Sequence, residues 1–262
     1  MSLTLTVIGC GSATPVGHRL SSAFVLRHNR QVFMIDCGEG AQMYLKENHI
    51  HMQRIQHILI SHLHGDHYFG LVGLLSSMHL FGRDYPLTVY APPELEHIVR
   101  YQLEVGQTEL SYPLRFVSLT GEEAFRIFDD KGLEVSAFPL QHGLPAYGFV
   151  FKEKTRPGGL NPARSFAYCS DTVYTESILP HIQGVDLLYH ESTFLESERN
   201  LAEKRLHSTA HQAAMLAQKA GVGKLLLGHY SARYADIQAF QAEAGEIFPQ
   251  VELAREGLQL TI

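Results

Sequence analysis

The feature that most constrains this 262-residue chain is a short run of histidines between two apolar segments. The run, Ser61-His-Leu-His-Gly-Asp-His67, follows the apolar triplet Ile58–Ile60. Tyr68–Phe81 comes next, and its apolar residues recur at the spacing of a helix. A buried strand, a polar turn and a helix in this order predict an α/β fold with a functional loop at the end of a strand.

The histidine run has the residue types and the spacing of a metal site. In an extended segment His62 and His64 point to the same side, because side chains alternate along a strand. Gly65 allows a sharp turn, after which Asp66 and His67 can face a second point. The segment can therefore supply ligands to two metals. Isolated surface histidines are common, but such a cluster beside buried strands would be costly without a partner.

The remaining ligands are expected at the ends of later strands, at His142, Asp171 and His229. We assign His62, His64 and His142 to one metal and Asp66, His67 and His229 to a second, with Asp171 bridging the two. Imidazole and carboxylate ligands without thiolate suit zinc best, and manganese or iron is also compatible. Structural zinc sites are usually closed and rich in cysteine, so this set indicates a catalytic site.

The rest of the chain alternates between strand-like and helix-like segments. Strands are expected at Thr4–Ile8, Ala23–Leu26, Gln31–Ile35, Ile58–Ile60, Leu87–Tyr90, Leu114–Val117, Leu133–Phe138, Tyr147–Phe151, Ser165–Cys169, Val185–Tyr189 and Lys224–Leu227. Helices are expected at Ala41–Glu47, over Tyr68–Phe81, from Pro93, between Cys169 and Val185, from an N-cap at Ser208 to Gly221, and at Asp236–Ile247. This order predicts an α/β sandwich of two sheets in a single domain, residues 1–262.

Composition excludes several classes of protein. The formal net charge of −6 excludes a strongly basic nucleic-acid-binding surface, although a local basic patch stays possible. The three widely spaced cysteines indicate a reducing cytoplasm and no disulfide framework. We find no apolar run of the ~20 residues that a membrane helix needs, and the first residues read as a strand and not as a signal peptide.

Several motifs along the chain together are more specific than the histidine run alone. They are Gly9–Pro15, Ile35–Gln42, Ser61–Leu75, Pro145–Gly148, Ser170–Thr172, His190–Thr193, His207–Thr209 and Gly228–Tyr234. The His-x-His-x-Asp-His string resembles the metallo-β-lactamase superfamily. The full set resembles its ribonuclease Z branch, the endonucleases that process the 3′ ends of tRNA.

This resemblance implies a four-layer αββα sandwich, two zinc ions and a homodimer. It implies that Asp36 supports the metal loop without binding metal, and that Glu191 and His207 handle protons beside the metals. Arg233 and Arg19 would contact phosphate or RNA.

Two positions depart from the family pattern. Family members usually carry a long tRNA-clamping arm where this chain has only the segment 152–164, which we expect to be a short exposed loop. Leu20 follows Arg19 where the family often has Arg-Asn. The departures affect tRNA binding more than they affect the chemistry.

The leading hypothesis is a zinc-dependent endoribonuclease that cuts the 3′ end of precursor tRNA through a metal-bound hydroxide. Asp66 would orient or deprotonate the nucleophile, and Glu191 with His207 would protonate the leaving oxygen. The first alternative is an armless phosphodiesterase of the same fold that acts on small diesters or other RNA. The second is a non-catalytic binding module that keeps metal for stability.

Overall fold

The computed structural model describes residues 3–16, 19–154 and 162–262. They form two compact units. We call Thr4–Thr120 with Arg255–Gln259 the N-terminal unit, and Gly121–Ala254 with Leu3 and Leu260–Ile262 the C-terminal unit. The prediction that 1–262 is one domain stays a prediction.

The first sheet has seven strands in the order β14-β1-β2-β3-β4-β5-β6. Their bounds are β1 (Leu3–Gly9), β2 (Ala23–His28), β3 (Gln31–Cys37), β4 (His57–Leu59), β5 (Leu87–Ala91), β6 (Leu114–Ser118) and β14 (Gln259–Thr261). β2 and β3 form an antiparallel hairpin, and β3 to β6 run parallel. The parallel strands β3 and β4 are neighbours, so the residues that follow them meet at one edge of the sheet.

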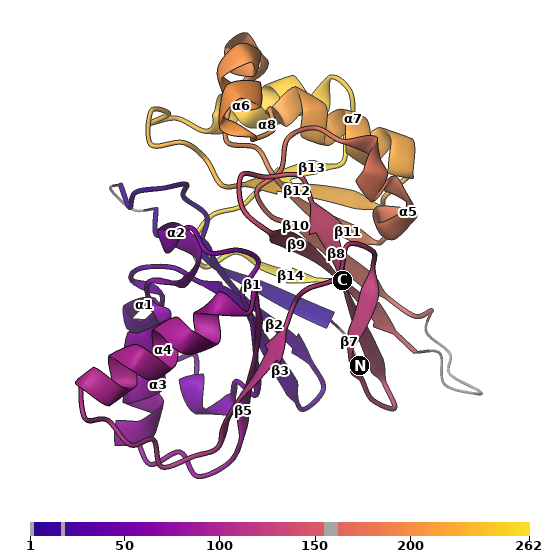
Figure 1. Ribbon diagram of the computed structural model, residues 1–262. Coiled ribbons are helices and arrows are strands. Elements are labelled where there is room, and N and C mark those ends of the chain that lie inside the picture. The colour runs from indigo at the N-terminus through magenta and orange to yellow at the C-terminus, as the bar shows by residue number, and fades with distance from the viewer. Residues whose placement is uncertain (1–2, 17–18, 155–161) are drawn as a thin grey trace. The chain divides into compact units, whose positions relative to one another are not determined.

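Helices α1 (Ala41–Glu47), α3 (Leu71–Leu80) and α4 (Glu94–Val105) lie on one side of this sheet, and the N-terminal unit also contains α2 (Gly65–Tyr68) and η1 (Met52–Arg54) (Figure 1). The helix predicted over Tyr68–Phe81 is confirmed for Leu71–Leu80 as α3, but the chain breaks before it, so Tyr68 ends the short helix α2 instead. The break lies at Gly70, whose amide donates to the carbonyl of Cys37 at 2.9 Å. A Cβ at Gly70 would lie 2.3 Å from the carbonyl oxygen of Gly38, so the close approach admits only glycine.

The second sheet also has seven strands, in the order β13-β12-β11-β10-β9-β8-β7. Their bounds are β7 (Phe125–Asp129), β8 (Leu133–Leu140), β9 (Ala146–Glu153), β10 (Ser165–Cys169), β11 (Leu187–Glu191), β12 (Lys224–Gly228) and β13 (Val251–Leu253). β7 to β10 pair antiparallel, and β10 to β13 pair parallel. The ends of β10, β11 and β12 therefore bring Asp171, Glu191 and His229 to one edge of this sheet.

The helices of the C-terminal unit are α5 (Leu179–Ile182), α6 (Arg199–Arg205), α7 (Ala210–Ala220) and α8 (Gln238–Gly245), with η2 (Glu176–Ile178) and η3 (Glu196–Glu198). α7 and α8 lie side by side (Figure 1). The N-cap of α7 is Thr209 and not Ser208, because Thr209 forms a reciprocal capping box with Gln212. α7 ends at Gly221, as predicted, with a φ of 61°.

The prediction has no counterpart for β7, β13, β14 and α6, nor for the short 3-10 helices η1 and η3. Three of them are strands of five residues or fewer, too short for a clear alternating pattern. None of the helices within the described residues is long and apolar enough to cross a membrane.

Candidate metal centre

In the N-terminal unit, the histidine run comprises the turn after β4 and most of helix α2, which contains Asp66 and His67. The Nε2 atom of His62 lies 3.1 Å from the Nδ1 atom of His64. The Nε2 atom of His67 lies 3.5 Å from a carboxylate oxygen of Asp66. The rings of His62 and His67 pack with centroids 4.1 Å apart. The structure therefore brings together all four ligands expected from this segment.

Asp36, near the end of β3, contacts the histidine run through its side chain. Its side chain is fully buried and accepts hydrogen bonds from the Ser61 amide at 2.8 Å and the Ser61 hydroxyl at 3.0 Å. It also lies 2.8 Å from the Nδ1 atom of His67. A proton on that Nδ1 leaves the Nε2 lone pair of His67 available to a metal. Asp36 thus orients the turn, and its φ of 56° is unusual for a residue with a Cβ.

The loop after β1 also reaches the histidine turn. The backbone amide of Ala13 donates to the Oδ2 atom of Asp66 at 2.7 Å. Arg19 lies in the same loop, where its backbone pairs with Val16. Ala13 was not among the residues expected at the site, since a backbone donor leaves no signature in the residue type.

In the C-terminal unit, three expected ligands follow strand ends. The Nε2 atom of His229 lies 3.2 Å from the Oδ1 atom of Asp171, and the Nε2 atom of His142 lies 3.9 Å from its Oδ2 atom. The Nδ1 atom of His142 lies 2.9 Å from the carbonyl oxygen of Leu206. That carbonyl can only accept, so the proton sits on Nδ1, and the Nε2 atom of His142, which faces Asp171, keeps its lone pair for a metal.

Glu191, the last residue of β11, is a fully buried carboxylate with several donors. Its Oε1 atom lies 2.9 Å from the Nδ1 atom of His207 and accepts from the amides of Thr172 and Ser208. Its Oε2 atom accepts from the amide and hydroxyl of Thr193 at 2.9 and 2.8 Å. Burial alone raises the pKa of Glu191, but the charge of His207 and its hydrogen bond outweigh burial, so the pKa lies below its ordinary value.

Thr193 is a residue of the site that the candidate set left out. Its Oγ1 atom lies 2.9 Å from the Nδ1 atom of His229 and 3.2 Å from that of His207. Because the hydroxyl has one proton and gives it to Glu191, it accepts from the Nδ1–H group of His229. The Nε2 atom of His229, which faces Asp171, then keeps its lone pair for a metal. The His-Glu-Ser-Thr motif contains Thr193, but only the fold brings it to the two histidines.

Arg233 lies in the C-terminal unit. Its side chain is 45% exposed, and its guanidinium lies 3.6 Å from Glu198 and 5.2 Å from the centre of the Phe194 ring. Its contact with phosphate or RNA stays a prediction.

The donor sets fit a divalent metal. The facing ring nitrogens of His62 and His64 lie 3.1 Å apart. Two lone pairs at that distance repel each other unless a proton or a cation lies between them. Ligand atoms of Asp171, His207 and His229 all lie within 4.8 Å of one another. Imidazole and carboxylate donors suit zinc and related ions.

Comparisons with known proteins agree with this reading. Residues 31–230 match the β-lactamase superfamily domain. Curated proteins called ribonuclease Z from Bacteroides thetaiotaomicron and Cytophaga hutchinsonii are 38% and 42% identical to this chain, and each alignment covers 98% of this chain and 95% of the relative. The crystal structure of human tRNase Z, short form, is similar with a TM-score of 0.83 and 30% identity, and the match covers 99% of both chains.

The chain belongs to the ribonuclease Z family. Its fold is therefore the metallo-β-lactamase fold, with two sheets flanked by helices, and the predicted fold class is confirmed. Membership also makes the chain a metal-dependent hydrolase, and together with the donor sets it indicates a divalent metal cofactor.

The ribonuclease Z alignments extend over 298 to 299 positions, more than the 262 residues of this chain. The relatives thus carry residues without a counterpart here. The predicted short loop 152–164 lies partly outside the described residues, but both ends are described. The amide of Glu153 donates to the carbonyl of Arg164 at 2.8 Å, and the Arg164 amide donates to the Glu153 carboxylate at 3.0 Å. β9 and β10 thus pair as far as Glu153 and Arg164.

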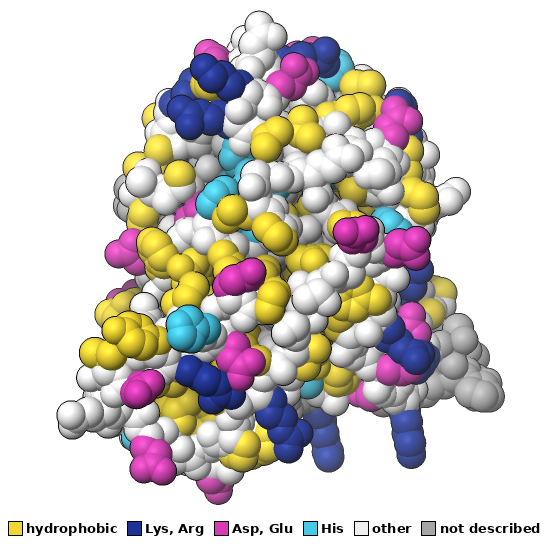
Figure 2. Space-filling view, viewed as in Figure 1, with side chains coloured by type: hydrophobic (Ala, Val, Ile, Leu, Met, Phe, Trp, Pro, Cys, Tyr) yellow, Lys and Arg dark blue, Asp and Glu magenta, His cyan; other side chains and the backbone are white. Residues whose placement is uncertain are grey.

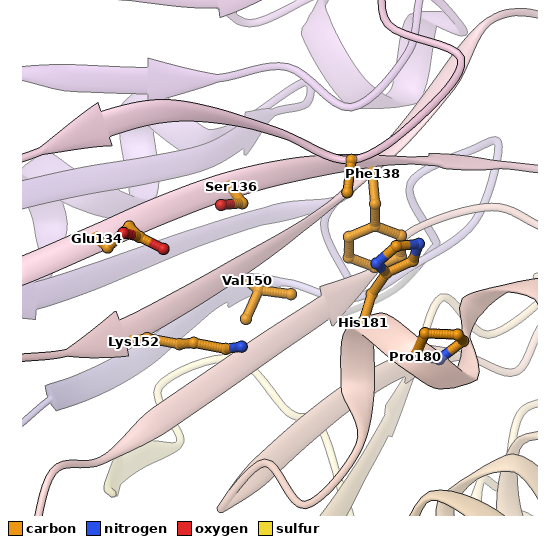
Figure 3. Close-up of a pocket in the computed structure, with 8 residues that line it drawn as sticks. Glu134, Ser136, Phe138, Val150, Lys152, Pro180 and His181 are labelled. Atoms are coloured by element: carbon orange, nitrogen blue, oxygen red, sulfur yellow. The ribbon is translucent and has the colours of Figure 1, made fainter.

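A cavity of about 160 Å³ lies elsewhere in the C-terminal unit (Figure 3). Its lining residues are Ala124, Glu134, Ser136, Phe138, Val150, Lys152, Pro180 and His181. The rings of Phe138 and His181 stack at its wall with centroids 5.0 Å apart. The cavity contains no predicted ligand or catalytic residue and is separate from the metal-binding groups of its unit.

Proposed function

We propose that this chain is an endoribonuclease that hydrolyses a phosphodiester at the 3′ end of precursor tRNA. One observation carries the proposal beyond family membership. The buried carboxylate of Glu191 holds His207 at 2.9 Å, beside the Asp171–His229 pair. A carboxylate that orients an imidazole next to metal ligands is an arrangement for proton transfer to a phosphate ester.

The metal ligands are assigned by the same proposal. His62, His64 and His142 would hold one zinc ion, Asp66, His67 and His229 would hold a second, and Asp171 would be shared between them. When bound, two such ions supply a water of lowered pKa and neutralise charge on the phosphate. Asp36, hydrogen-bonded to Ser61 and His67, supports the ligand loop.

The protein side chains handle the protons. His207 uses its Nδ1 atom for the contact with Glu191, so its exchangeable proton is on Nε2. His207 gives this proton to the leaving oxygen as the phosphorus–oxygen bond breaks, and the charge of Glu191 stabilises the imidazolium beforehand. Asp66 accepts the proton of the attacking water. Arg233 and Arg19 contact the substrate phosphates.

A second candidate is a phosphodiesterase of the same fold that acts on small diesters or other RNA. The closed pairing of Glu153 with Arg164 favours it, because a long tRNA-clamping arm has no room in that short connection. On the face shown in Figure 2, basic side chains are interspersed with acidic ones and form no continuous basic surface. With a formal net charge of −6, RNA binding would rest on local contacts near the site.

We also propose that the protein is a cytoplasmic homodimer. The small number and wide spacing of its three cysteines support a reducing compartment. The dimer rests on family resemblance, and light scattering that returned a mass of 29.4 kDa would contradict it.

The test is a comparison of the zinc-loaded protein on a precursor tRNA with a 3′ trailer and on a chromogenic phosphate diester. Asp66→Ala should abolish both activities, whereas Glu104→Ala, at an exposed position on α4, should change neither. Cleavage of the tRNA after the discriminator base supports the proposal. Hydrolysis of the diester with intact tRNA favours the second candidate.

A further inference from the structure

Glu256, near the C-terminus, contacts a loop that lies far from it in the sequence. Its Oε1 atom accepts a hydrogen bond from the amide of Leu20 at 2.9 Å, and the Sγ atom of Cys10 lies 3.7 Å from the same oxygen. Backbone bonds fix the segment that carries Glu256, since Gly257 donates to Val7 at 2.9 Å and Val7 donates to Leu258 at 3.0 Å. The backbone next to Glu256 is therefore held in place by hydrogen bonds to β1.

The contacted loop, which we call the Ala13 loop, comprises Cys10–Val16 together with Arg19 and Leu20. Its two ends are joined by the Gly11 amide, which donates to the Leu20 carbonyl at 2.8 Å. Leu20 thus uses its amide for Glu256 and its carbonyl for Gly11. Glu256 holds the loop at the point where it closes.

Leu20, the departure from the family pattern, also anchors the loop by its side chain. A Cβ at Gly40 would lie 2.9 Å from the Cδ2 atom of Leu20, so the leucine packs directly on the backbone of Gly40. Gly40 has a φ of 85°, which favours glycine there in any case. The loop is thus held on two sides, by an apolar contact and by Glu256.

The far part of the Ala13 loop reaches the metal-binding turn. The amide of Ala13 donates to the Oδ2 atom of Asp66 at 2.7 Å, which restrains rotation of that carboxylate. Ala13 has a φ of 58°, a left-handed conformation that is unfavourable for a residue with a Cβ. Such a conformation persists only where the surrounding structure imposes it. The closed loop is what imposes it here.

We propose that Glu256 is a positioning residue that keeps the Ala13 loop closed and thereby holds the Ala13 amide on Asp66. The role of Asp66 as ligand and base rests on the proposed function, whereas the closure of the loop does not. Glu256 lies outside the ligand set and contacts the loop through the amide of Leu20 and the thiol of Cys10.

The experiment compares three variants with the wild-type protein. Glu256→Ala removes the acceptor, and Glu256→Gln keeps an oxygen acceptor without the charge. Glu252→Ala is the matched control, because Glu252 is a nearby glutamate whose side chain pairs with Lys224 at the surface. Each protein is measured without metal by hydrogen–deuterium exchange of peptides that cover Cys10–Val16, and with zinc for kcat and KM on the chromogenic diester.

We expect Glu256→Ala to speed exchange of these peptides about tenfold or more and to leave peptides of α7 unchanged. Its kcat should fall about 10- to 100-fold with little change in KM. This is the usual effect of removing a residue that orients metal ligands without binding the metal itself. Glu256→Gln should stay within about threefold of wild type in both measurements. Rescue by glutamine and a local change in exchange would not follow from a general loss of stability.

Two results would overturn the proposal. One is a folded Glu256→Ala protein whose loop exchanges at the wild-type rate, and the other is faster loop exchange with an unchanged kcat. If Glu256→Ala does not fold, Glu256→Asp, which withdraws the acceptor by one methylene, is judged by the same two criteria. If the wild-type protein hydrolysed no diester, the proposed function would fail, while the exchange comparison would still decide whether Glu256 closes the loop.

Discussion

The backbone carbonyl of Leu206 lies 2.9 Å from the Nδ1 atom of His142, 64 residues away in the sequence. Leu206 ends α6 in a left-handed conformation, with a φ of 57°. This conformation, which costs a residue with a Cβ roughly 1–2 kcal/mol, turns the carbonyl toward the histidine. An unfavourable backbone geometry thus fixes the tautomer of a proposed metal ligand.

Leu206→Pro should weaken zinc binding about 10- to 100-fold, because proline cannot adopt a positive φ and the carbonyl must move. Leu206→Gly is the control, since glycine adopts the native φ and keeps the carbonyl in place. Competition with a chromogenic chelator measures both affinities. Equal zinc affinity in the two variants would show that the Leu206 carbonyl does not orient His142.

Thr193→Val should lower kcat on the diester about 10- to 100-fold, because valine keeps the shape of threonine but removes the hydroxyl that contacts Glu191, His207 and His229. It should also destabilise the protein by about 1–3 kcal/mol, since buried partners lose a hydrogen bond. Thr193→Ser restores the hydroxyl and should recover most of the activity. A Thr193→Val protein as active as wild type would contradict the role of the hydroxyl.

Much of this arrangement could be predicted from local patterns. The alternation of His62 and His64 and the position of Asp171 and His229 after apolar strands depend on short-range rules of strand geometry. The structure places these residues together within each unit, and the ribonuclease Z resemblance is confirmed. The assignment of individual ligands to two metals stays a prediction.

Contacts that depend on distant parts of the chain could not be predicted. Ala13 and Leu206 act through backbone groups in left-handed conformations, which neither alanine nor leucine signals. The break between α2 and α3 arises because Gly70 packs on the end of β3, and periodicity within Tyr68–Phe81 does not record that contact. The hydrophobic pattern predicts which residues are buried, but it does not predict which distant segment packs against them.

Asp186→Asn should reduce stability at neutral pH and have little effect in acid. Burial raises the pKa of Asp186, but hydrogen bonds from Ser165 and Arg164 outweigh it, so the pKa is lowered in the folded state. A lowered pKa stabilises the fold above the unfolded value of about 3.9, and this contribution is lost as the pH falls through the folded pKa.

Urea unfolding followed by circular dichroism at pH 7 and near pH 2 checks this sign. The midpoint of Asp186→Asn should lie below that of wild type at pH 7, by a modest amount because the pair with Arg164 is partly exposed. The two midpoints should converge in acid. A difference that grew in acid would mean that the Asp186 carboxylate does not stabilise the start of β10.

Arg83→Lys should destabilise the N-terminal unit by about 2–4 kcal/mol, although the charge is kept. The guanidinium is almost fully buried and donates to the carbonyls of Tyr85, Gln53 and Pro86 at 2.9 to 3.1 Å. It also lies 4.0 Å from the centre of the Tyr85 ring. A lysine ammonium cannot reach three carbonyls in a plane, so buried acceptors would lose their partners.

Arg126→Lys is the matched control, because Arg126 is 60% exposed and pairs with Asp129 at the surface. It should cost less than about 1 kcal/mol. Urea unfolding of both variants gives the comparison. Hydrolysis of the chromogenic diester by the zinc-loaded proteins is measured as well, to distinguish a loss of stability from a loss of catalysis. An Arg83→Lys protein as stable as the Arg126→Lys control would mean that the carbonyls around Arg83 find other donors, and that the buried arginine does not join η1 to the residues before β5.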